Sequence, residues 1–298
     1  MMKKEFKSGF VTLVGRPNVG KSTLLNYMIG EKISIVSDKI QTTRNRIHGI
    51  LTDDEAQIVF VDTPGVHKPK HELGDAMVNI SIQSLGDVDV VLFVINAHEG
   101  FGKGDEFIIN KMNELNIPVF LVINKIDLVH PDDLLPLIAS YNEKFDFTET
   151  VPVSALNGNN VDTLRSLIKA YLPEGPQFYD EQDKTDRSLQ FQIGEIVREK
   201  VLHFTEEEIP HSVHVVVESI EKKGNRTHIH ALIITERPSQ KGILIGKRGS
   251  MLKQIGIAAR KELEAHLQTK VNLQLWIKVV KDWRNRRNLL EQYGFELE

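Results

Sequence analysis

Residues 15–22, GRPNVGKS, constrain the fold more than any other stretch of the chain. Two glycines bracket four residues and precede Lys21 and Ser22, a pattern in which backbone N–H groups wrap around phosphates. The pattern functions only in a turn between a strand and a helix, and from average residue usage roughly one chain in a hundred of this length would match it by chance. The apolar run before the turn and the helical spacing of 21–29 after it supply that context. We therefore predict a phosphate-binding turn at the end of a buried strand.

The first 172 residues alternate short apolar runs with segments of helical spacing. Runs rich in valine and isoleucine predict buried strands at 9–15, 57–63, 88–96, 118–125 and 150–155. Helical spacing predicts helices between them, for example at 21–29 and 105–113. Strands that alternate with helices indicate an α/β domain with a mostly parallel sheet, which binds ligands at the carboxyl ends of its strands.

Three more motifs follow predicted strands and favour a guanine nucleotide. Asp62 in VDTPG is placed to hold Mg²⁺, and the N–H of Gly65 to contact a γ-phosphate. In NKID, the Asp127 carboxylate matches the two adjacent donors of guanine, which adenine lacks, while Asn124 and Lys125 brace the loop. Ser154 and Ala155 offer a backbone N–H to guanine O6. The predicted nucleotide contacts are Gly15, Arg16, Pro17, Asn18, Val19, Gly20, Lys21, Ser22, Thr23, Asp62, Thr63, Pro64, Gly65, Asn124, Lys125, Asp127, Ser154 and Ala155.

Length and charge indicate a second, different unit. The 298 residues suggest about two domains. From Gln190 onward the chain contains 18 Lys and Arg but only 14 Asp and Glu, although the net charge of the whole chain is −4. Prolines and dense charge at 173–188 predict a linker between a domain at 1–172 and one at 189–298. The absence of cysteine excludes disulfides, and no secretory signal or membrane span is recognisable, which favours the cytoplasm.

The second unit contains GILIGKRGSM, residues 242–251, which resembles the first loop but lacks its spacing and its Ser or Thr. The expected order is helix, strand, strand, glycine loop, helix and strand, with a hairpin turn at 222–225 and a short apolar turn before the glycines. This order resembles a type II KH domain, a small α+β fold whose G-x-x-G loop clamps a nucleic acid backbone. The predicted RNA contacts are Ile245, Gly246, Lys247, Arg248, Gly249 and Lys253, over a groove floor of Ile243, Leu244, Ile245, Ile255 and Ile257.

GRPNVGKS, QTTRNR, DTPG, NKID and VSA together resemble the successive motifs of the Era-like branch of the translational-factor-like GTPases. The resemblance implies slow Mg²⁺-dependent hydrolysis of GTP to GDP, with Mg²⁺ held by Ser22, Asp62 and a switch threonine. Thr43 is that threonine, with Thr42 as the competing choice. Val66 stands where a water-orienting glutamine would be, and related GTPases with this change use K⁺, for which Asn18 is the hypothetical ligand.

The resemblance also implies partners: small-subunit ribosomal RNA, the 30S subunit during its assembly, and peripheral contact with the inner membrane, for a monomer in the cytoplasm. An alternative is a membrane-peripheral GTPase whose basic tail, with Trp283, Arg284, Arg286 and Arg287, meets lipid or a protein. An equally good interpretation of that tail is that Trp283 packs inside the fold. His228 and His230 share a strand face but lack further metal ligands, and Trp276 is expected to pack.

Overall fold

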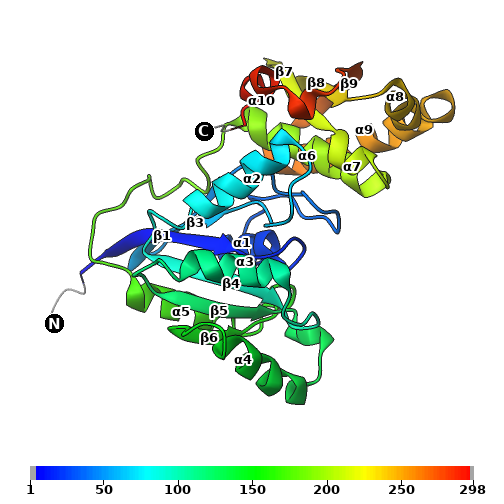
Figure 1. Cartoon of the computed structure of the whole chain (residues 1–298). Coiled ribbons are helices and arrows are strands. Elements are labelled where there is room, and N and C mark those ends of the chain that lie inside the picture. Colours follow the sequence, from blue (N-terminus) through cyan, green and yellow to red (C-terminus); the bar gives the residue numbers. More distant parts are fainter. Residues whose placement is uncertain (1–4, 296–298) are drawn as a thin grey trace. The chain divides into compact units, whose positions relative to one another are not determined.

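The computed structural model describes residues 5–295, which form two compact units (Figure 1). The first unit comprises the chain up to Ser34, Thr43–Lys70 and Gly74–Asp186. The second comprises Ile35–Thr42, His71–Leu73 and the chain from Arg187 onward. The boundary between Asp186 and Arg187 falls inside the stretch for which the sequence predicts a linker.

Within residues 5–186, six strands form one sheet in the order β2-β3-β1-β4-β5-β6, and β2 is the strand that runs antiparallel to its neighbour. Helices lie between the parallel strands along the chain, because parallel neighbours need a long crossover connection. The elements are β1 Lys7–Val14, α1 Lys21–Ile29, β2 Ile47–Thr52, β3 Ala56–Asp62, α2 Glu72–Gln83, β4 Val90–Asn96, α3 Lys103–Met112, β5 Val119–Asn124, α4 Leu134–Asn142, β6 Glu149–Pro152 and α5 Val161–Tyr171.

Alternation along the central strands divides the core of this unit into two layers. In β4, Leu92 and Val94 belong to the cluster that contains the buried residues of α1 and α5, while Phe93 and Ile95 belong to the cluster that contains those of α3 and α4. Both faces of the sheet are therefore covered by helices, which explains why β3 and β4 are buried along their whole length.

The strand order places the predicted ligand residues at one edge of the sheet. From β1 the sheet extends through β3 on one side and through β4 on the other, so a crevice opens at the carboxyl end of β1. Because β1, β3 and β5 are parallel, the segments that follow Val14, Asp62 and Asn124 emerge at this same edge.

Strand β2 was not expected from the sequence. Its residues, IHGILT, contain a glycine and only a short apolar run, so the pattern is too weak to be recognised alone. It forms because Asp53 closes a tight turn into β3, where its Oδ1 accepts the N–H groups of Glu55 at 3.0 Å and Ala56 at 3.1 Å.

The segment predicted to be a linker lies against the first unit as a strap along β2. The N–H of Ile50 donates to the carbonyl of Lys184 at 2.9 Å, and Gly49 and Thr185 form an antiparallel bridge. The side chain of Gln57 in β3 accepts the N–H of Phe178 at 2.6 Å and donates to the carbonyl of Tyr179 at 2.9 Å. The strap therefore covers the edge strand of the sheet, where exposed backbone groups would otherwise pair with other chains.

In the second unit, three strands within residues 187–295 form a sheet in the order β7-β8-β9. Strands β7 and β8 pair antiparallel, and β8 and β9 pair parallel. Apolar residues of α6, α8 and α9 pack on one face of it, including Val197, Leu244 and Ala259. The elements are α6 Leu189–Phe204, α7 Ile209–Ser212, β7 His214–Lys223, β8 Arg226–Thr235, α8 Pro238–Ile245, α9 Ser250–Leu267, β9 Lys270–Val279 and α10 Arg287–Gln292.

The segment before the glycine loop and the side chain of Trp276 both differ from expectation. The residues before the glycine loop form helix α8 rather than a short apolar turn, because Pro238 occupies the first turn and the Gln240 side chain accepts the N–H groups of Glu236 and Arg237. A helix of 8 residues is too short to display a helical period in the sequence. Trp276 does not pack: it lies on the face of β9 away from the helices and is 61 % exposed.

Candidate nucleotide-binding site and nucleic-acid interface

The loop between β1 and α1 is built for close approach of a ligand to the backbone. Gly20 has φ +98°, and a Cβ there would lie 2.2 Å from Nδ2 of Asn124, so a substitution would strain the backbone and displace Asn124. Gly20 also caps α1 without a side chain, which leaves the first N–H groups of the helix available for an anion. Local sequence and neighbouring loop therefore both select glycine at this position.

Lys21 is buried at the base of this loop, with its ammonium held by the loop itself. Its Nζ donates to the carbonyls of Gly15 at 3.1 Å and Arg16 at 3.0 Å. Burial lowers the pKa of Lys21 to about 8, and the nearby Asp62 carboxylate opposes this by favouring the charged form. A bound phosphate would supply the negative charge that this desolvated ammonium lacks.

Three side-chain oxygens come together beside Lys21. The Ser22 hydroxyl donates to Oδ2 of Asp62 at 2.7 Å and lies 2.9 Å from the Thr43 hydroxyl. Oδ1 of Asp62 is buried and has no hydrogen-bond partner among residues 5–295. Burial raises the pKa of Asp62, against the opposing effects of Lys21 and of hydroxyl groups that include Ser22 and Thr43. Hydroxyl and carboxylate oxygens are ligands that Mg²⁺ prefers, so this set fits the cation.

The two candidate switch threonines occupy different positions. Thr43 belongs to the oxygen cluster just described. The Thr42 hydroxyl instead donates to the carbonyl of Lys39 at 2.6 Å. Geometry therefore favours Thr43 over Thr42 as a cation ligand.

Asn124 links the phosphate loop to the two loops expected to recognise a base. Its Nδ2 donates to the carbonyl of Val19 at 2.9 Å, and its Oδ1 accepts the N–H groups of Lys125 at 2.8 Å and Ala155 at 2.9 Å. Lys125 also donates from Nζ to the carbonyl of Asn18 at 2.7 Å. One buried amide thus fixes the phosphate loop to both base-recognition loops.

Asp127 is exposed at this edge, and Oδ1 of its carboxylate accepts the Ser154 hydroxyl at 2.5 Å. The backbone N–H groups expected near guanine O6 are engaged otherwise: Ser154 donates to the carbonyl of Asn159 at 3.1 Å, and Ala155 to Asn124. Here Ser154 acts through its hydroxyl, by orienting Asp127.

Several of the expected contact residues support the loops from within. Val19, Thr63 and Pro64 are buried, and the Thr63 hydroxyl donates to the carbonyl of Leu13 at 2.7 Å. Arg16 reaches away to an ion pair with Asp105 at 3.1 Å. Thr23 is half-buried in the first turn of α1, as is Pro17 in the loop.

Val66 occupies the position of the absent glutamine and is itself buried. Its side chain is 5 % exposed and packs in the cluster of Val14 and Phe93. Its N–H donates to the carbonyl of Gly15 at 3.1 Å. An apolar side chain held in the core cannot orient a water molecule, which agrees with the interpretation of the sequence.

The second glycine loop follows helix α8 directly. Gly246 has φ +71°, and a Cβ there would lie 2.8 Å from the backbone N of Met251. Lys247 and Arg248 are exposed at the tip, and Gly249 begins helix α9. Beside the loop lies a groove of about 400 Å³ lined by Gly249, Leu252, Lys253, Gly256, Ile257, Arg260, Leu273 and Leu275.

This groove corrects the expected floor. Of the five apolar residues proposed from the sequence, Ile257 lines the groove. Leu244 and Ile255 are fully buried in the core, Ile245 is half-buried against the same core, and Ile243 lines a different cavity. Leu252, Leu273, Leu275 and the cation Arg260 were missed. Helical spacing could have identified Arg260, because Lys253, Ile257 and Arg260 are four and three residues apart and share one face of α9.

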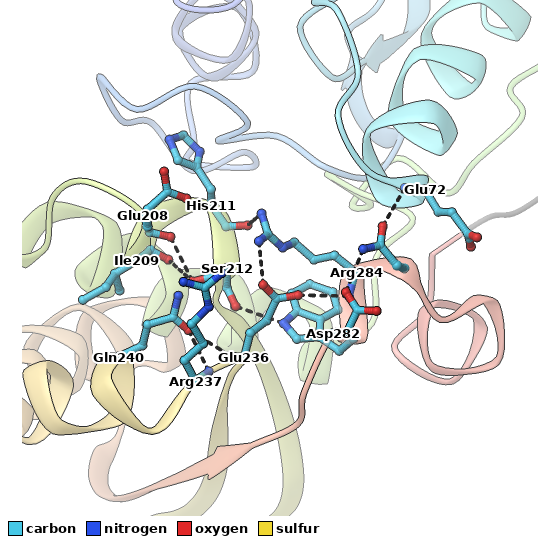
Figure 2. Close-up of polar contacts among 12 residues, drawn as sticks. Glu72, Glu208, Ile209, His211, Ser212, Glu236, Arg237, Gln240, Asp282 and Arg284 are labelled. Atoms are coloured by element: carbon cyan, nitrogen blue, oxygen red, sulfur yellow. Dashed lines mark hydrogen bonds and ion pairs between the residues drawn. The ribbon is translucent and has the colours of Figure 1, made fainter.

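The basic tail is folded into the second unit (Figure 2). Trp283 is fully buried and donates from Nε1 to the carbonyl of Ser212 at 3.0 Å. Arg284 forms a buried ion pair with Glu236 at 2.5 Å. These two side chains therefore stabilise the fold and do not face a ligand, whereas Arg286 and Arg287 are exposed.

Neither a membrane span nor a cluster of metal-binding carboxylates and histidines occurs in the described chain. No helix within residues 5–295 has the length and apolar character needed to cross a bilayer. The same residues contain no group of three or more His, Asp or Glu side chains able to hold a metal, and His228 contacts Asn272 at 3.2 Å.

Comparison with known families agrees with this geometry. A family described as 50S ribosome-binding GTPase matches residues 10–125, and a KH domain family matches residues 208–284. Fold, sites and matches define the class of this protein: a P-loop GTPase domain followed by a KH domain, as the sequence predicted. More specifically, the chain belongs to the Era family of GTPases.

Two solved structures establish this membership. The Era protein of Aquifex aeolicus, as a variant bound to GDP and AlF4⁻, is 46 % identical with a TM-score of 0.94. An Era protein in complex with MgGDPNP and nucleotides 1506–1542 of 16S ribosomal RNA is 47 % identical with a TM-score of 0.95. Each match covers 98 % of this chain and 100 % of the other. The expected resemblance and the GTPase class are thereby confirmed.

Proposed function

We propose that this chain binds and slowly hydrolyses GTP with Mg²⁺, binds single-stranded RNA of the small ribosomal subunit through its KH domain, and assists assembly of the 30S subunit. The observation that carries the proposal is the 47 % identity, over nearly the whole chain, to an Era protein solved with both MgGDPNP and 16S ribosomal RNA. The same proposal treats the protein as a monomer of the cytoplasm.

Different residues of the first unit contact different parts of the nucleotide. Lys21 pairs with the β- and γ-phosphate oxygens, and the N–H of Gly65 contacts the γ-phosphate. Ser22, Thr43 and Asp62, whose oxygens lie together, would hold Mg²⁺. When bound, Mg²⁺ would neutralise charge that develops on the phosphate oxygens. Asp127 accepts two hydrogen bonds from guanine, in an orientation fixed by Ser154.

We expect slow turnover because Val66 stands at the position of a water-orienting glutamine. Val66 is buried and apolar, so acceleration depends on charge around the phosphates. We propose that a K⁺ ion near Asn18 supplies part of that charge. Asn18 is exposed in the phosphate loop at φ +61°, and its carbonyl accepts Nζ of Lys125.

In the second unit, RNA phosphates lie against the Gly246–Gly249 loop and bases enter the neighbouring groove. Backbone exposed by the glycines approaches the phosphates, with Lys247 and Arg248 as counter-charges. The apolar groove offers Leu252, Ile257 and Leu275 to unstacked bases, and Lys253 and Arg260 to the backbone. The loop needs no Ser or Thr because no cation is bound there.

Charge reversal at the loop tests the RNA proposal. We expect Lys247→Glu with Arg248→Glu to weaken binding of an oligonucleotide with the sequence of nucleotides 1506–1542 by about a hundredfold, roughly 1.4 kcal/mol for each charge. The control reverses Lys222 and Lys223, which are also exposed and lie on the β7–β8 hairpin of the same unit, where Lys223 pairs with Glu221. Equal losses in the two variants, or none in the loop variant, would overturn the assignment.

A further inference from the structure

A second cavity of the KH unit lies between the loop after α6 and helix α8. Its volume is about 310 Å³. Its lining residues come from the 204–209 segment on one side and from the start and middle of α8 on the other. They are Phe204, Thr205, Glu206, Glu207, Glu208, Ile209, Arg237, Ser239, Gln240 and Ile243, none of which lines the RNA groove.

The apolar part of this cavity is preformed. Ile243, from α8, is 54 % exposed, and Ile209, which lines the same cavity, is 4 % exposed. Gln240 is buried and fixed, because its Oε1 accepts the N–H groups of Glu236 and Arg237, each at 3.0 Å (Figure 2). Gln240 is therefore held in place, and one aliphatic side chain is available to a ligand.

The rim of the cavity is acidic. Glu206, Glu207 and Glu208 are all exposed, and none of them forms an ion pair within residues 5–295. Of the lining residues, Arg237 alone is cationic, so three carboxylates face one guanidinium and leave a net charge of −2.

We propose that this cavity binds a basic peptide segment of a partner protein, which inserts one apolar side chain against Ile243 and pairs its cations with the glutamates. Three unpaired carboxylates repel a nucleic acid and attract lysine and arginine. A volume of about 310 Å³ is at the small end for ligand sites, which suits a single anchoring side chain. This surface is distinct from the GTP and RNA sites, and its partner is a protein.

The position of the cavity gives such a partner a route to the RNA loop. Helix α8 contributes Ile243 to the cavity and leads, three residues later, into Gly246 of the glycine loop. A basic segment anchored at Ile243 would thus lie beside an RNA-binding loop without competing for its cations. Proteins with basic extensions that themselves contact RNA have this chemistry.

The test uses the full chain and the labelled peptide Lys-Arg-Leu-Lys-Lys, followed by fluorescence anisotropy. We expect saturable binding with a Kd below about 1 mM, and at least about a tenfold rise in Kd for Glu206→Lys with Glu208→Lys. Ile243→Ser should raise the Kd about fivefold, as should a probe with glycine in place of leucine, because each removes an apolar contact.

The control carries the same change of charge elsewhere on the unit. Glu218→Lys with Glu221→Lys alters two exposed glutamates of β7 and should leave the Kd within about twofold, which excludes general attraction to an acidic protein. Every variant should bind the RNA oligonucleotide at least as well as the wild type, as evidence of an intact fold. Absence of saturable binding, or equal effects of the β7 and rim variants, would refute the proposal.

Discussion

The hydrogen bonds of Asn124 make it the residue whose loss should do most damage to the GTPase unit. Its amide connects the phosphate loop at Val19, the backbone of Lys125 and the loop at Ala155. The side chain is 2 % exposed. In Asn124→Ala all three partners would lose their bond at a site that water cannot easily enter.

The expected cost follows from these contacts. Three hydrogen bonds at about 1 kcal/mol each give a loss of about 3 kcal/mol in the free energy of unfolding. Lys125 sits at φ +66° and depends on Asn124 to hold it, so the base loop should also lose its orientation. We therefore expect GDP affinity to fall at least about tenfold, or ~1.4 kcal/mol.

The assay must separate the two units, because a single unfolding midpoint has no defined meaning for a chain of two domains. Both tryptophans, Trp276 and Trp283, lie in the second unit. Tryptophan fluorescence in urea therefore follows the KH unit alone, whereas circular dichroism follows both. In Asn124→Ala the fluorescence transition should be unchanged, and an earlier transition should appear in the circular dichroism.

Asn96 supplies the matched control. It ends β4 as Asn124 ends β5, and it is also buried, but its bonds to Glu99 and His98 are local. Asn96→Ala should cost about 1–2 kcal/mol and leave GDP affinity unchanged. The reasoning is refuted if Asn124→Ala costs less than about 1 kcal/mol, or if both variants lose GDP affinity equally.

Three other outcomes are expected. GDP affinity should be constant up to pH 8 and fall about tenfold per pH unit above it. The reason is that Lys21, whose pKa is about 8, must then take up a proton to pair with the phosphates. Calorimetry measures the affinity, and it should show no such slope for Lys21→Met. GTP turnover should be about tenfold faster in potassium than in sodium buffer, and equal rates would exclude an ion at Asn18. Arg284→Ala should destabilise the KH unit by about 3 kcal/mol by leaving Glu236 buried and unpaired, whereas Arg287→Ala, at an exposed pair, should cost less than about 0.5 kcal/mol by tryptophan fluorescence.

Local patterns in the sequence were sufficient wherever the chemistry is carried by neighbouring residues. The GRPNVGKS loop, the helix after it and the buried parallel strands all followed from spacing, because burial on both faces leaves continuous apolar runs. Sequence patterns did not predict strand β2 and helix α8. Each is short and is fixed by side-chain hydrogen bonds, from Asp53 and Gln240, that no periodicity reveals.

The sequence by itself thus determined a guanine nucleotide site and a glycine loop suited to RNA. Only the tertiary structure decided which face each residue presents, because burial depends on elements distant in the chain. Leu244 enters the core while its neighbour Ile243 lies exposed beside three glutamates, and Trp283 is buried while Trp276 is not. Residues 173–186, a linker by composition, became the cover of an edge strand because β2 offered them unpaired backbone groups.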